Sequence, residues 1–110
     1  MDNKVNTRLC GMLGFAMRAG KVIIGTETVC SYMAKDRKPN LVLIATDASE
    51  GTKKKLLHKA EFYGVEIITI NIDSSELGRL LGKLYAPATV AICDSHFAEE
   101  IKRAAEPGAN

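Results

Sequence analysis

The sequence contains no tryptophan and only six aromatic residues, three phenylalanines and three tyrosines. So few aromatic residues, with no cluster of the kind found in RNP motifs, argue against a sheet that binds RNA by stacking several bases on exposed aromatics. No apolar run approaches the roughly 18 residues that a membrane-spanning helix needs. The first ten residues, MDNKVNTRLC, also lack the hydrophobic stretch of a secretion signal. We therefore expect a cytoplasmic protein that has no membrane partner.

Cysteine and histidine are scarce as well, which limits metal and redox chemistry. The three cysteines, Cys10, Cys30 and Cys93, have no close spacing, and each stands among apolar neighbours. Reduced, buried thiols are the expectation, because a zinc site needs a CxxC pair or paired cysteines and histidines. The chain has only two histidines and no glycine-rich dinucleotide- or phosphate-binding motif. We expect no metal and no cofactor.

The net charge is only +2, but the charges are unevenly distributed. Residues 1–59 hold 11 Lys and Arg against 5 Asp and Glu, whereas residues 60–110 hold 4 against 8. The first part therefore carries +6 and the second −4. This asymmetry indicates either one basic face for an anionic partner or a solvated surface whose charges mix in three dimensions.

Hydrophobic periodicity divides the chain into alternating helices and strands. Apolar residues at helical spacing from Val5 to Ala16 predict a first helix. The expected helices are residues 4–19, 26–37, 50–63, 74–85 and 96–105, and the expected strands are 22–24, 41–47, 65–70 and 88–93. This alternation predicts one α/β domain over residues 1–110, with helices on both faces of the sheet. The pattern alone favours an all-parallel sheet.

The first helix contains two glycines that need an explanation, and the helix from residue 74 has a predicted cap and an apolar stripe. Gly11 and Gly14 lie inside the first helix, where glycine lowers helix propensity, and we attribute them to close packing against a sheet or another helix. The helix from residue 74 is expected to begin at a serine cap. Its apolar stripe consists of Leu77, Leu80, Leu81 and Leu84.

Two strand ends carry side chains with catalytic potential. CDSH at residues 93–96 brings four reactive side chains together, but adjacent side chains point in different directions, whereas a triad needs a directed hydrogen-bond chain. The structural alternative is a buried Cys93, a helix cap at Asp94 or Ser95 and an exposed histidine. In TDAS at residues 46–49, Asp47 could bind magnesium or act as a base, or it could close a turn and cap a helix. We expect no catalytic residue.

A basic run, TKKK at residues 52–55, places three lysines in the first turns of a helix. There they oppose the helix dipole, at a cost of roughly 0.3–1 kcal/mol for each charge. A phosphate partner would offset this placement. The alternative is a solvated basic helix start.

Four segments of the chain stand out together: LGFAMRAGKVIIGTETV, LVLIATDASEGTKKKL, ELGRLLGK and ATVAICDSHFAEEI. In this order they resemble the L-seven-Ae family of ribosomal proteins, and in particular its small bacterial, YlxQ-like branch. The resemblance covers about residues 4–104. It implies a three-layer α/β/α sandwich with a four-stranded mixed sheet. It also implies binding of structured RNA that contains a kink-turn, in which a bulge flanks tandem sheared G·A pairs.

The resemblance implies an RNA-reading edge at the start of the second helix. In the family, a glycine turn and the following helix start enter the groove of the kinked RNA, and Gly25 and Thr26 match that motif. The next positions differ, because the family usually carries Asn or Lys and then Glu or Gln where this chain has Glu27 and Thr28, and Lys in place of Ser31. These differences favour RNA binding over strict kink-turn specificity. Alternatively, Glu27 complements the helix dipole and Thr26 caps the helix.

The second contact that the resemblance implies is the loop before the last strand, which covers an extruded bulge base. It consists here of Tyr85, Ala86, Pro87 and Ala88. Together with the nearby lysines Lys21, Lys53 and Lys54, these stretches predict a non-catalytic RNA-binding protein associated with the ribosome or with translation. One alternative is a protein-interaction module of the same fold with little or no RNA affinity. Another is an enzyme that uses Asp47 or residues 93–96.

Overall fold

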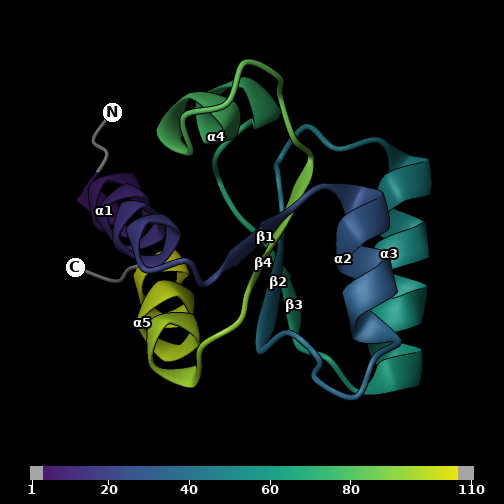
Figure 1. Cartoon of the computed structure of the whole chain (residues 1–110). Helices are drawn as coiled ribbons and strands as arrows, with labels where there is room; N and C mark the ends of the chain where they lie inside the picture. The colour runs from purple at the N-terminus through teal and green to yellow at the C-terminus, as the bar shows by residue number, and fades with distance from the viewer. Residues whose placement is uncertain (1–3, 107–110) are drawn as a thin grey trace.

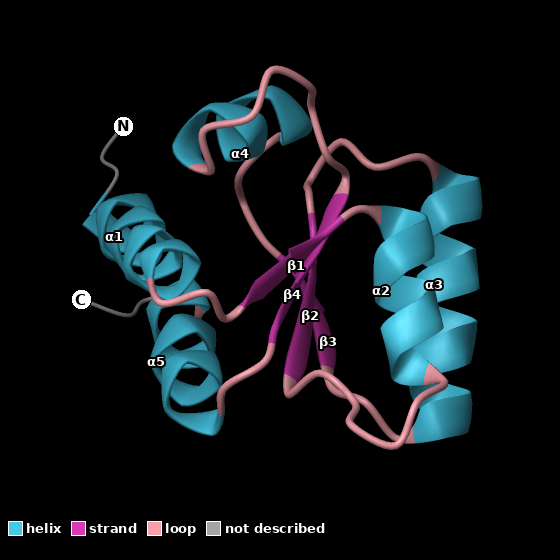
Figure 2. Cartoon of the chain, in the orientation of Figure 1, coloured by secondary structure: helices cyan, strands magenta, loops and turns pink. Residues whose placement is uncertain are grey.

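The computed structural model describes residues 4–106, with side chains from Thr7 onward. Within this range the helices are α1 (Lys4–Arg18), α2 (Thr26–Met33), α3 (Glu50–Tyr63), α4 (Ser74–Leu80) and α5 (Ser95–Ala105), and the strands are β1 (Val22–Ile24), β2 (Leu41–Ile44), β3 (Ile67–Thr69) and β4 (Thr89–Ile92). The strands form one sheet, with α1 and α5 on one face and α2 and α3 on the other (Figure 1). The short α4 lies on the side of α1 (Figure 2). This arrangement confirms the three-layer α/β/α sandwich.

The sheet is mixed, as the family resemblance implies. Its strand order is β1-β4-β2-β3, and β4 runs antiparallel to both of its neighbours while β2 and β3 are parallel. The all-parallel sheet favoured by the pattern alone is therefore wrong. The strand β4 is buried along its whole length, and such an apolar run does not reveal which way the strand points. Its direction follows from the loop at residues 81–88, which returns the chain to the end of β2.

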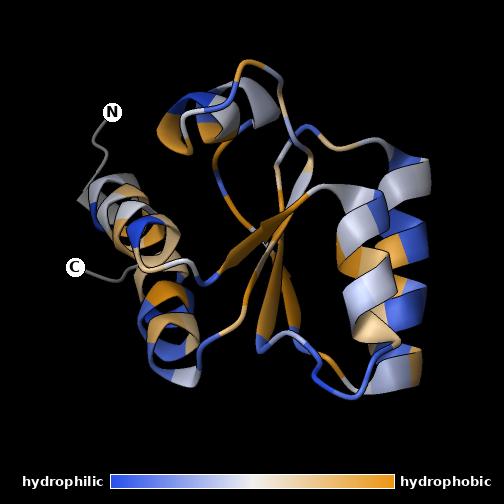
Figure 3. Cartoon of the chain, viewed as in Figure 1, coloured by the Kyte–Doolittle hydropathy of each residue, from blue (hydrophilic) through white to orange (hydrophobic). Residues whose placement is uncertain are grey.

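Alternate residues of the central strands fill two separate hydrophobic cores. Leu41 and Leu43 of β2 belong to the core beneath α1, α4 and α5, whereas Val42 and Ile44 belong to the core beneath α2 and α3. All four side chains are buried, and the strands are mostly orange in the hydropathy colouring of Figure 3. Successive side chains of a strand point to opposite faces, so a uniformly apolar run supplies both cores.

Several elements are shorter than the pattern predicts. The strands expected at 41–47, 65–70 and 88–93 are shortened to the bounds given above, and the helix expected at 26–37 ends at Met33. Ala45 and Ile70 lie beyond these strands but are still buried. The apolar pattern therefore reports burial correctly, although the chain has already left the regular strand at these residues.

The helix α4 differs most from its prediction. It ends at Leu80 rather than at residue 85, and its N-cap is Asp73, whose carboxylate accepts from the Glu76 amide at 2.8 Å. The expected serine cap is therefore wrong. Leu77 is buried, but Leu84 is fully exposed, so the expected leucine stripe stops before Leu84.

The glycines of α1 lack the close packing expected for them. A Cβ at Gly11 would meet no described atom within 4 Å, and one at Gly14 would touch only the guanidinium of Arg18, at 3.6 Å. The close approach occurs instead at Gly78 in α4, where a Cβ would overlap the backbone oxygen of Tyr85. The side chain of Val5, which the predicted apolar stripe includes, lies outside the described residues.

The topology brings distant parts of the chain to one edge of the sheet. At this edge β1, β2 and β3 end and β4 begins; it is drawn at the top in Figure 1 and is called the upper edge below. The opposite edge is the lower edge. Two backbone hydrogen bonds join the segments of the upper edge, from the Gly25 amide to the Thr89 oxygen at 2.9 Å and from the Ala45 amide to the Ala88 oxygen at 2.8 Å. The start of α2 and the loop at 81–88 are therefore neighbours in space.

Candidate nucleic-acid interface

The start of α2 occupies the upper edge and has no side-chain cap among the described residues. Its N-cap is Gly25, whose φ of 108° and ψ of 138° form a backbone conformation that residues with side chains rarely adopt. Glycine has no side chain with which to accept from the helix amides. The amides of the first turn and the positive end of the helix dipole are therefore available to an anionic group.

Thr26 uses its side chain inside the protein. Its Oγ1 lies 2.8 Å from the Oγ1 of Thr89, which is fully buried in β4. The two hydroxyls satisfy each other, so this hydroxyl fastens the start of α2 to the sheet. The helix cap proposed at Thr26 as an alternative is wrong, because the N-cap is Gly25.

Glu27, Thr28 and Ser31 are exposed on α2. Glu27 is paired with α3, since its Oε2 accepts from the Nζ of Lys55 at 2.5 Å although the Glu27 side chain is 83% exposed. This hydrogen bond lowers the pKa of Glu27 and raises the pKa of Lys55. Exposed ion pairs are weak in water, so a ligand could displace either partner.

Lys53 and Lys54 lie in the second turn of α3, the helix beside α2 (Figure 1). The helix begins at Glu50, and its N-cap Ser49 accepts from the Thr52 amide at 3.1 Å. The dipole effect falls off beyond the first turn, and Glu50 complements the dipole within it. The conflict between these lysines and the helix dipole is therefore smaller than the sequence predicts, and a phosphate is not required to stabilise them.

The loop at residues 81–88 forms another part of the upper edge. Tyr85 is 57% exposed and Ala86 is exposed, whereas Pro87 is buried. The backbone at Tyr85 passes directly over Gly78 of α4. A hollow beside this loop is lined by Ser75, Arg79, Lys83, Leu84, Tyr85 and Ala86. The loop thus combines a fixed proline with exposed apolar groups and neighbouring cations.

Both aspartates considered for catalysis cap helices. Asp47 accepts from the amide of Ser74 at 2.8 Å and from its hydroxyl at 2.9 Å, and these hydrogen bonds lower the pKa of Asp47. Asp94 is the N-cap of α5 and accepts from the Phe97 amide at 2.8 Å. The turn-and-cap alternative is confirmed for Asp47. Sequence reasoning had no local signal for its partner, which lies 27 residues away.

The three cysteines are free thiols, with Cys30 buried and Cys10 and Cys93 partly buried. Burial raises the pKa of Cys10 and of Cys93, which keeps both thiols protonated at neutral pH. Within residues 4–106, no group of three or more His, Cys, Asp or Glu residues could hold a metal ion. No helix within these residues is long and apolar enough to cross a membrane.

Lys21 lies at the edge of the sheet opposite to the other predicted site residues, of which Ser31 is in the second half of α2. It precedes β1, and its backbone oxygen accepts from the Cys93 amide at 2.8 Å, at the lower edge. Four residue steps of extended chain, about 13 Å, lead from Lys21 to Gly25. The upper-edge site consequently comprises Gly25, Thr26, Glu27, Thr28, Ser31, Lys53, Lys54 and residues 85–88. The sequence did not indicate the Lys55 partner of Glu27 or the approach of the loop to Gly78.

The amino-acid sequence matches the model of the ribosomal protein L7Ae/L30e/S12e/Gadd45 family over residues 7–102. The chain belongs to this family. It is 36% identical over 107 residues to the RNA-binding protein YlxQ of Enterococcus faecium, which covers 96% of this chain and 99% of that protein. It is also 31% identical over 93 residues to the large ribosomal subunit protein eL30 of Sulfurisphaera tokodaii, covering 82% of this chain and 87% of that protein.

The fold of this chain is also similar to the solved structure of a protein with unknown function from Bacillus halodurans. It superposes with a TM-score of 0.83 at 27% identity, covering 91% of this chain and 98% of that one. These matches confirm the family resemblance and its YlxQ-like branch. They also support the expectation that the protein is not an enzyme, because the relatives are named as RNA-binding and ribosomal proteins.

Proposed function

We propose that this protein is a non-catalytic, cytoplasmic RNA-binding protein that recognises kink-turn-like RNA and is associated with the ribosome or with translation. The upper-edge site is the proposed interface. The observation that supports it best is the meeting of the uncapped start of α2 with the loop at 81–88 at one edge of the sheet. Relatives that match 96% and 82% of the chain are named RNA-binding protein YlxQ and ribosomal protein eL30, respectively.

Gly25 gives RNA access to the backbone of the protein. Without a Cβ at the N-cap, a phosphate or a base edge can approach the first-turn amides closely. Lys53 and Lys54 then attract the flanking phosphates independently of sequence. The loop completes the interface, because exposed Tyr85 and Ala86 offer an apolar surface to an extruded base, and buried Pro87 limits the entropy lost on binding.

Glu27 and Lys55 exchange partners on binding. In the free protein the Lys55 ammonium holds the Glu27 carboxylate at 2.5 Å. In the complex the carboxylate accepts from the edge of a guanine, and the ammonium released by this step contacts a phosphate. The exchange replaces one charge-assisted hydrogen bond by two, which offsets the loss of the pair.

The proposal is tested by measuring fluorescence anisotropy with a kink-turn stem and with a straight duplex of equal length. The wild-type protein should bind the kink-turn stem more tightly. Changing Thr28→Glu together with Ser31→Lys adds an acceptor and a cation at two exposed positions of α2. The double variant should tighten kink-turn binding by roughly tenfold to a hundredfold, about 1–3 kcal/mol, and scarcely affect the duplex.

The control is Ser31→Lys alone, which adds the cation without the acceptor, and circular dichroism checks that every variant is folded. Equal tightening on both RNAs would show only the sequence-independent attraction of the added lysine for phosphate. A folded double variant that responds to neither RNA would contradict this location of the site. A wild-type protein that binds neither RNA would favour the protein-interaction module.

A further inference from the structure

The lower edge carries positive charges that the proposed interface does not use. Lys21 precedes β1, and the loop between α2 and β2 contributes Lys35, Arg37 and Lys38, all of them exposed. These four residues are called the second basic cluster below. Within the same loop the one acidic residue is Asp36, and the loop is largely blue in the hydropathy colouring of Figure 3.

Two of these cations are held by neutral groups. The Nζ of Lys35 lies 4.5 Å from the ring centroid of Tyr32. The Nζ of Lys38 donates to the backbone oxygen of Lys35 at 3.1 Å and lies 5.7 Å from the ring centroid of Tyr63. Such contacts orient an ammonium without neutralising it. They therefore reduce the loss of side-chain entropy that accompanies the binding of an anion.

Lys21 joins this group through the end of β4. The backbone amide of Cys93 donates to the Lys21 oxygen at 2.8 Å, and the Lys21 charge counteracts the burial that raises the pKa of the Cys93 thiol. Cys93 in turn lines a hollow together with Tyr32, Asp36, Arg37, Lys38 and Asn40. Arg37 and Lys38 therefore line one depression in the surface together with the Asn40 amide and Asp36, and Lys21 lies beside it through its contact with Cys93.

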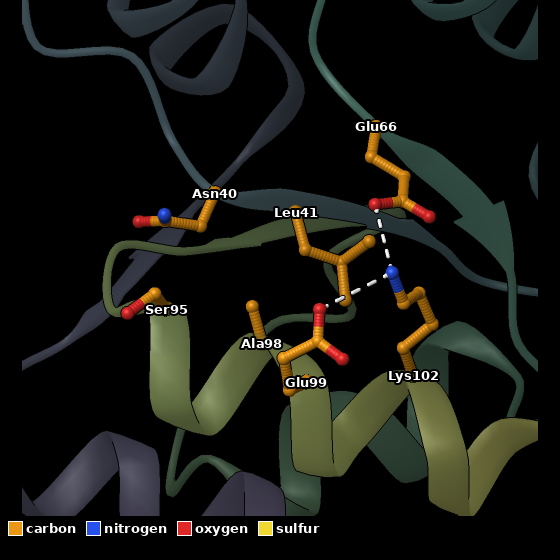
Figure 4. Close-up of a pocket in the computed structure, with 7 residues that line it drawn as sticks. All are labelled: Asn40, Leu41, Glu66, Ser95, Ala98, Glu99 and Lys102. Carbon is orange, nitrogen blue, oxygen red and sulfur yellow. Dashed lines mark hydrogen bonds and ion pairs between the residues drawn. The ribbon is translucent and has the colours of Figure 1, made fainter.

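The cluster is not neutralised by ion pairs within the described part of the chain. The ion pairs found there involve Lys55, Arg79, Lys102 and Arg103 instead. A neighbouring hollow at the same edge shows the contrast, because its Lys102 is bonded to Glu66 at 3.0 Å and paired with Glu99 at 3.4 Å (Figure 4). Of these two hollows, the one beside Arg37 carries the excess of positive charge.

We propose that the second basic cluster binds the phosphate backbone of a second RNA segment, so that one protein molecule bridges two segments. Arginine, lysine and amide side chains such as Arg37, Lys38 and Asn40 suit phosphate oxygens, whereas the cores of protein interfaces are depleted of charge. The inference rests on the proposed function, because it takes RNA as the anionic partner of the cluster. The cluster follows the C-terminus of α2, whereas the upper-edge site is centred on its N-terminus, about 12 Å away along the helix, and of that site only Ser31 lies in the second half of α2. The two surfaces face opposite edges of the sheet, so they accept separate RNA segments.

Three double variants, each removing two positive charges, test this inference in the full chain. The first is Lys21→Gln with Arg37→Gln, two side chains for which the described residues provide no hydrogen bond or ion pair, so folding should be unaffected. The second is Lys53→Gln with Lys54→Gln at the upper edge. The control is Arg8→Gln with Arg103→Gln, on α1 and α5. Energy transfer between donor-labelled and acceptor-labelled RNA stems reports bridging, and anisotropy over a salt series reports the number of phosphate contacts.

The Lys21/Arg37 variant should lose bridging while its kink-turn affinity at the first site stays unchanged. The salt slope of its duplex binding should fall by up to about 1.8, at about 0.9 for each phosphate contact. The Lys53/Lys54 variant should instead weaken the first complex, and the control should resemble the wild-type protein. A Lys21/Arg37 variant that behaves like the control would overturn the inference.

The same experiment separates this inference from the proposed function. If the wild-type protein shows no preference for the kink-turn stem but the Lys21/Arg37 variant still lowers the duplex slope, the proposed specificity fails and the second surface stands. If the kink-turn preference is present and the Lys21/Arg37 variant bridges like the wild-type protein, only the second surface fails.

Discussion

The loop at residues 85–88 can be displaced without changing any residue proposed to contact RNA, by the substitution Gly78→Ala. Gly78 is buried inside α4, and an added Cβ would overlap the backbone oxygen of Tyr85 and lie 3.1 Å from the Cδ of Pro87. Contacts of a real Cβ are essentially never shorter than 3.0 Å. Because the blocking atom belongs to the backbone, either the loop or α4 has to move.

The expected size of the effect combines two opposing terms. Overfilling a well-packed site costs about 1–3 kcal/mol, whereas replacing glycine by alanine inside a helix contributes about 1 kcal/mol of stability. A clash with backbone belongs at the upper end of the first range, so we expect a net loss of about 1–2 kcal/mol. For a chain of this length, that loss lowers Tm by about 4–8 °C.

The chain offers a matched control in Gly11→Ala. This is the same chemical change inside a helix, but Gly11 is exposed and an added Cβ would meet no described atom within 4 Å. Only the helix-propensity term remains, so this variant should be more stable than the wild-type protein by up to about 1 kcal/mol. The two substitutions should therefore have effects of opposite sign.

Thermal and urea denaturation measure the stability of both variants, and anisotropy at a temperature where both are folded measures RNA affinity. Gly78→Ala should weaken binding of the kink-turn stem and leave duplex binding unchanged, because the loop covers a base that a straight duplex does not extrude. If Gly78→Ala stabilises the protein as Gly11→Ala does, the reasoning about the loop contact is refuted. A loss of stability with unaltered kink-turn affinity would instead exclude the loop from the interface.

Two further predictions concern the supports of the upper edge. Thr26→Val should lower the free energy of unfolding by about 1–3 kcal/mol, because the buried Thr89 hydroxyl loses its 2.8 Å partner. In urea denaturation, the double variant Thr26→Val, Thr89→Val should recover part of the lost stability. A Thr26→Val variant as stable as the wild-type protein would contradict the role of the pair. The folded-state pKa of Asp47 is lowered by Ser74, so its contribution to stability is present above the unfolded pKa of about 4 and is lost as pH falls through the lower folded-state pKa. The wild-type protein should therefore lose more stability between pH 7 and pH 3 than Asp47→Asn does, and equal losses would show that these hydrogen bonds do not favour the ionised carboxylate.

Some elements follow from local interactions, and for these the sequence was sufficient. The helix at residues 50–63 has the predicted bounds, because its end is set by Gly64, which adopts the left-handed conformation of a C-cap with φ of 71°. The strand Val22–Ile24 also has its predicted bounds. In both cases the signal that sets the bounds lies within a few residues of the element. For the helix it is the glycine at its end, and for the strand it is the run of β-branched residues.

The direction of β4 and the partners of the charged residues required the folded chain. An apolar strand that is buried on both faces has the same hydrophobic pattern whichever way it runs. The mixed sheet was therefore indicated by the family resemblance and not by periodicity. Glu27 and Lys55 are 28 residues apart, and their pairing depends on α2 and α3 lying on the same face of the sheet. The closeness of Gly78 to Tyr85 depends in the same way on where the loop turns.

Lys21 and Gly25 show most clearly what the tertiary structure decided. They are close in the sequence and were predicted to share a site, but an extended strand carries the chain about 3.3 Å with each residue. A three-residue strand between them therefore places them at opposite edges of the sheet. Gly25 is joined instead to Thr89, far away in the sequence, by a hydrogen bond of 2.9 Å. The sequence indicated where each strand lies along the chain, whereas pairing between strands decides where the strands end and which of those ends meet.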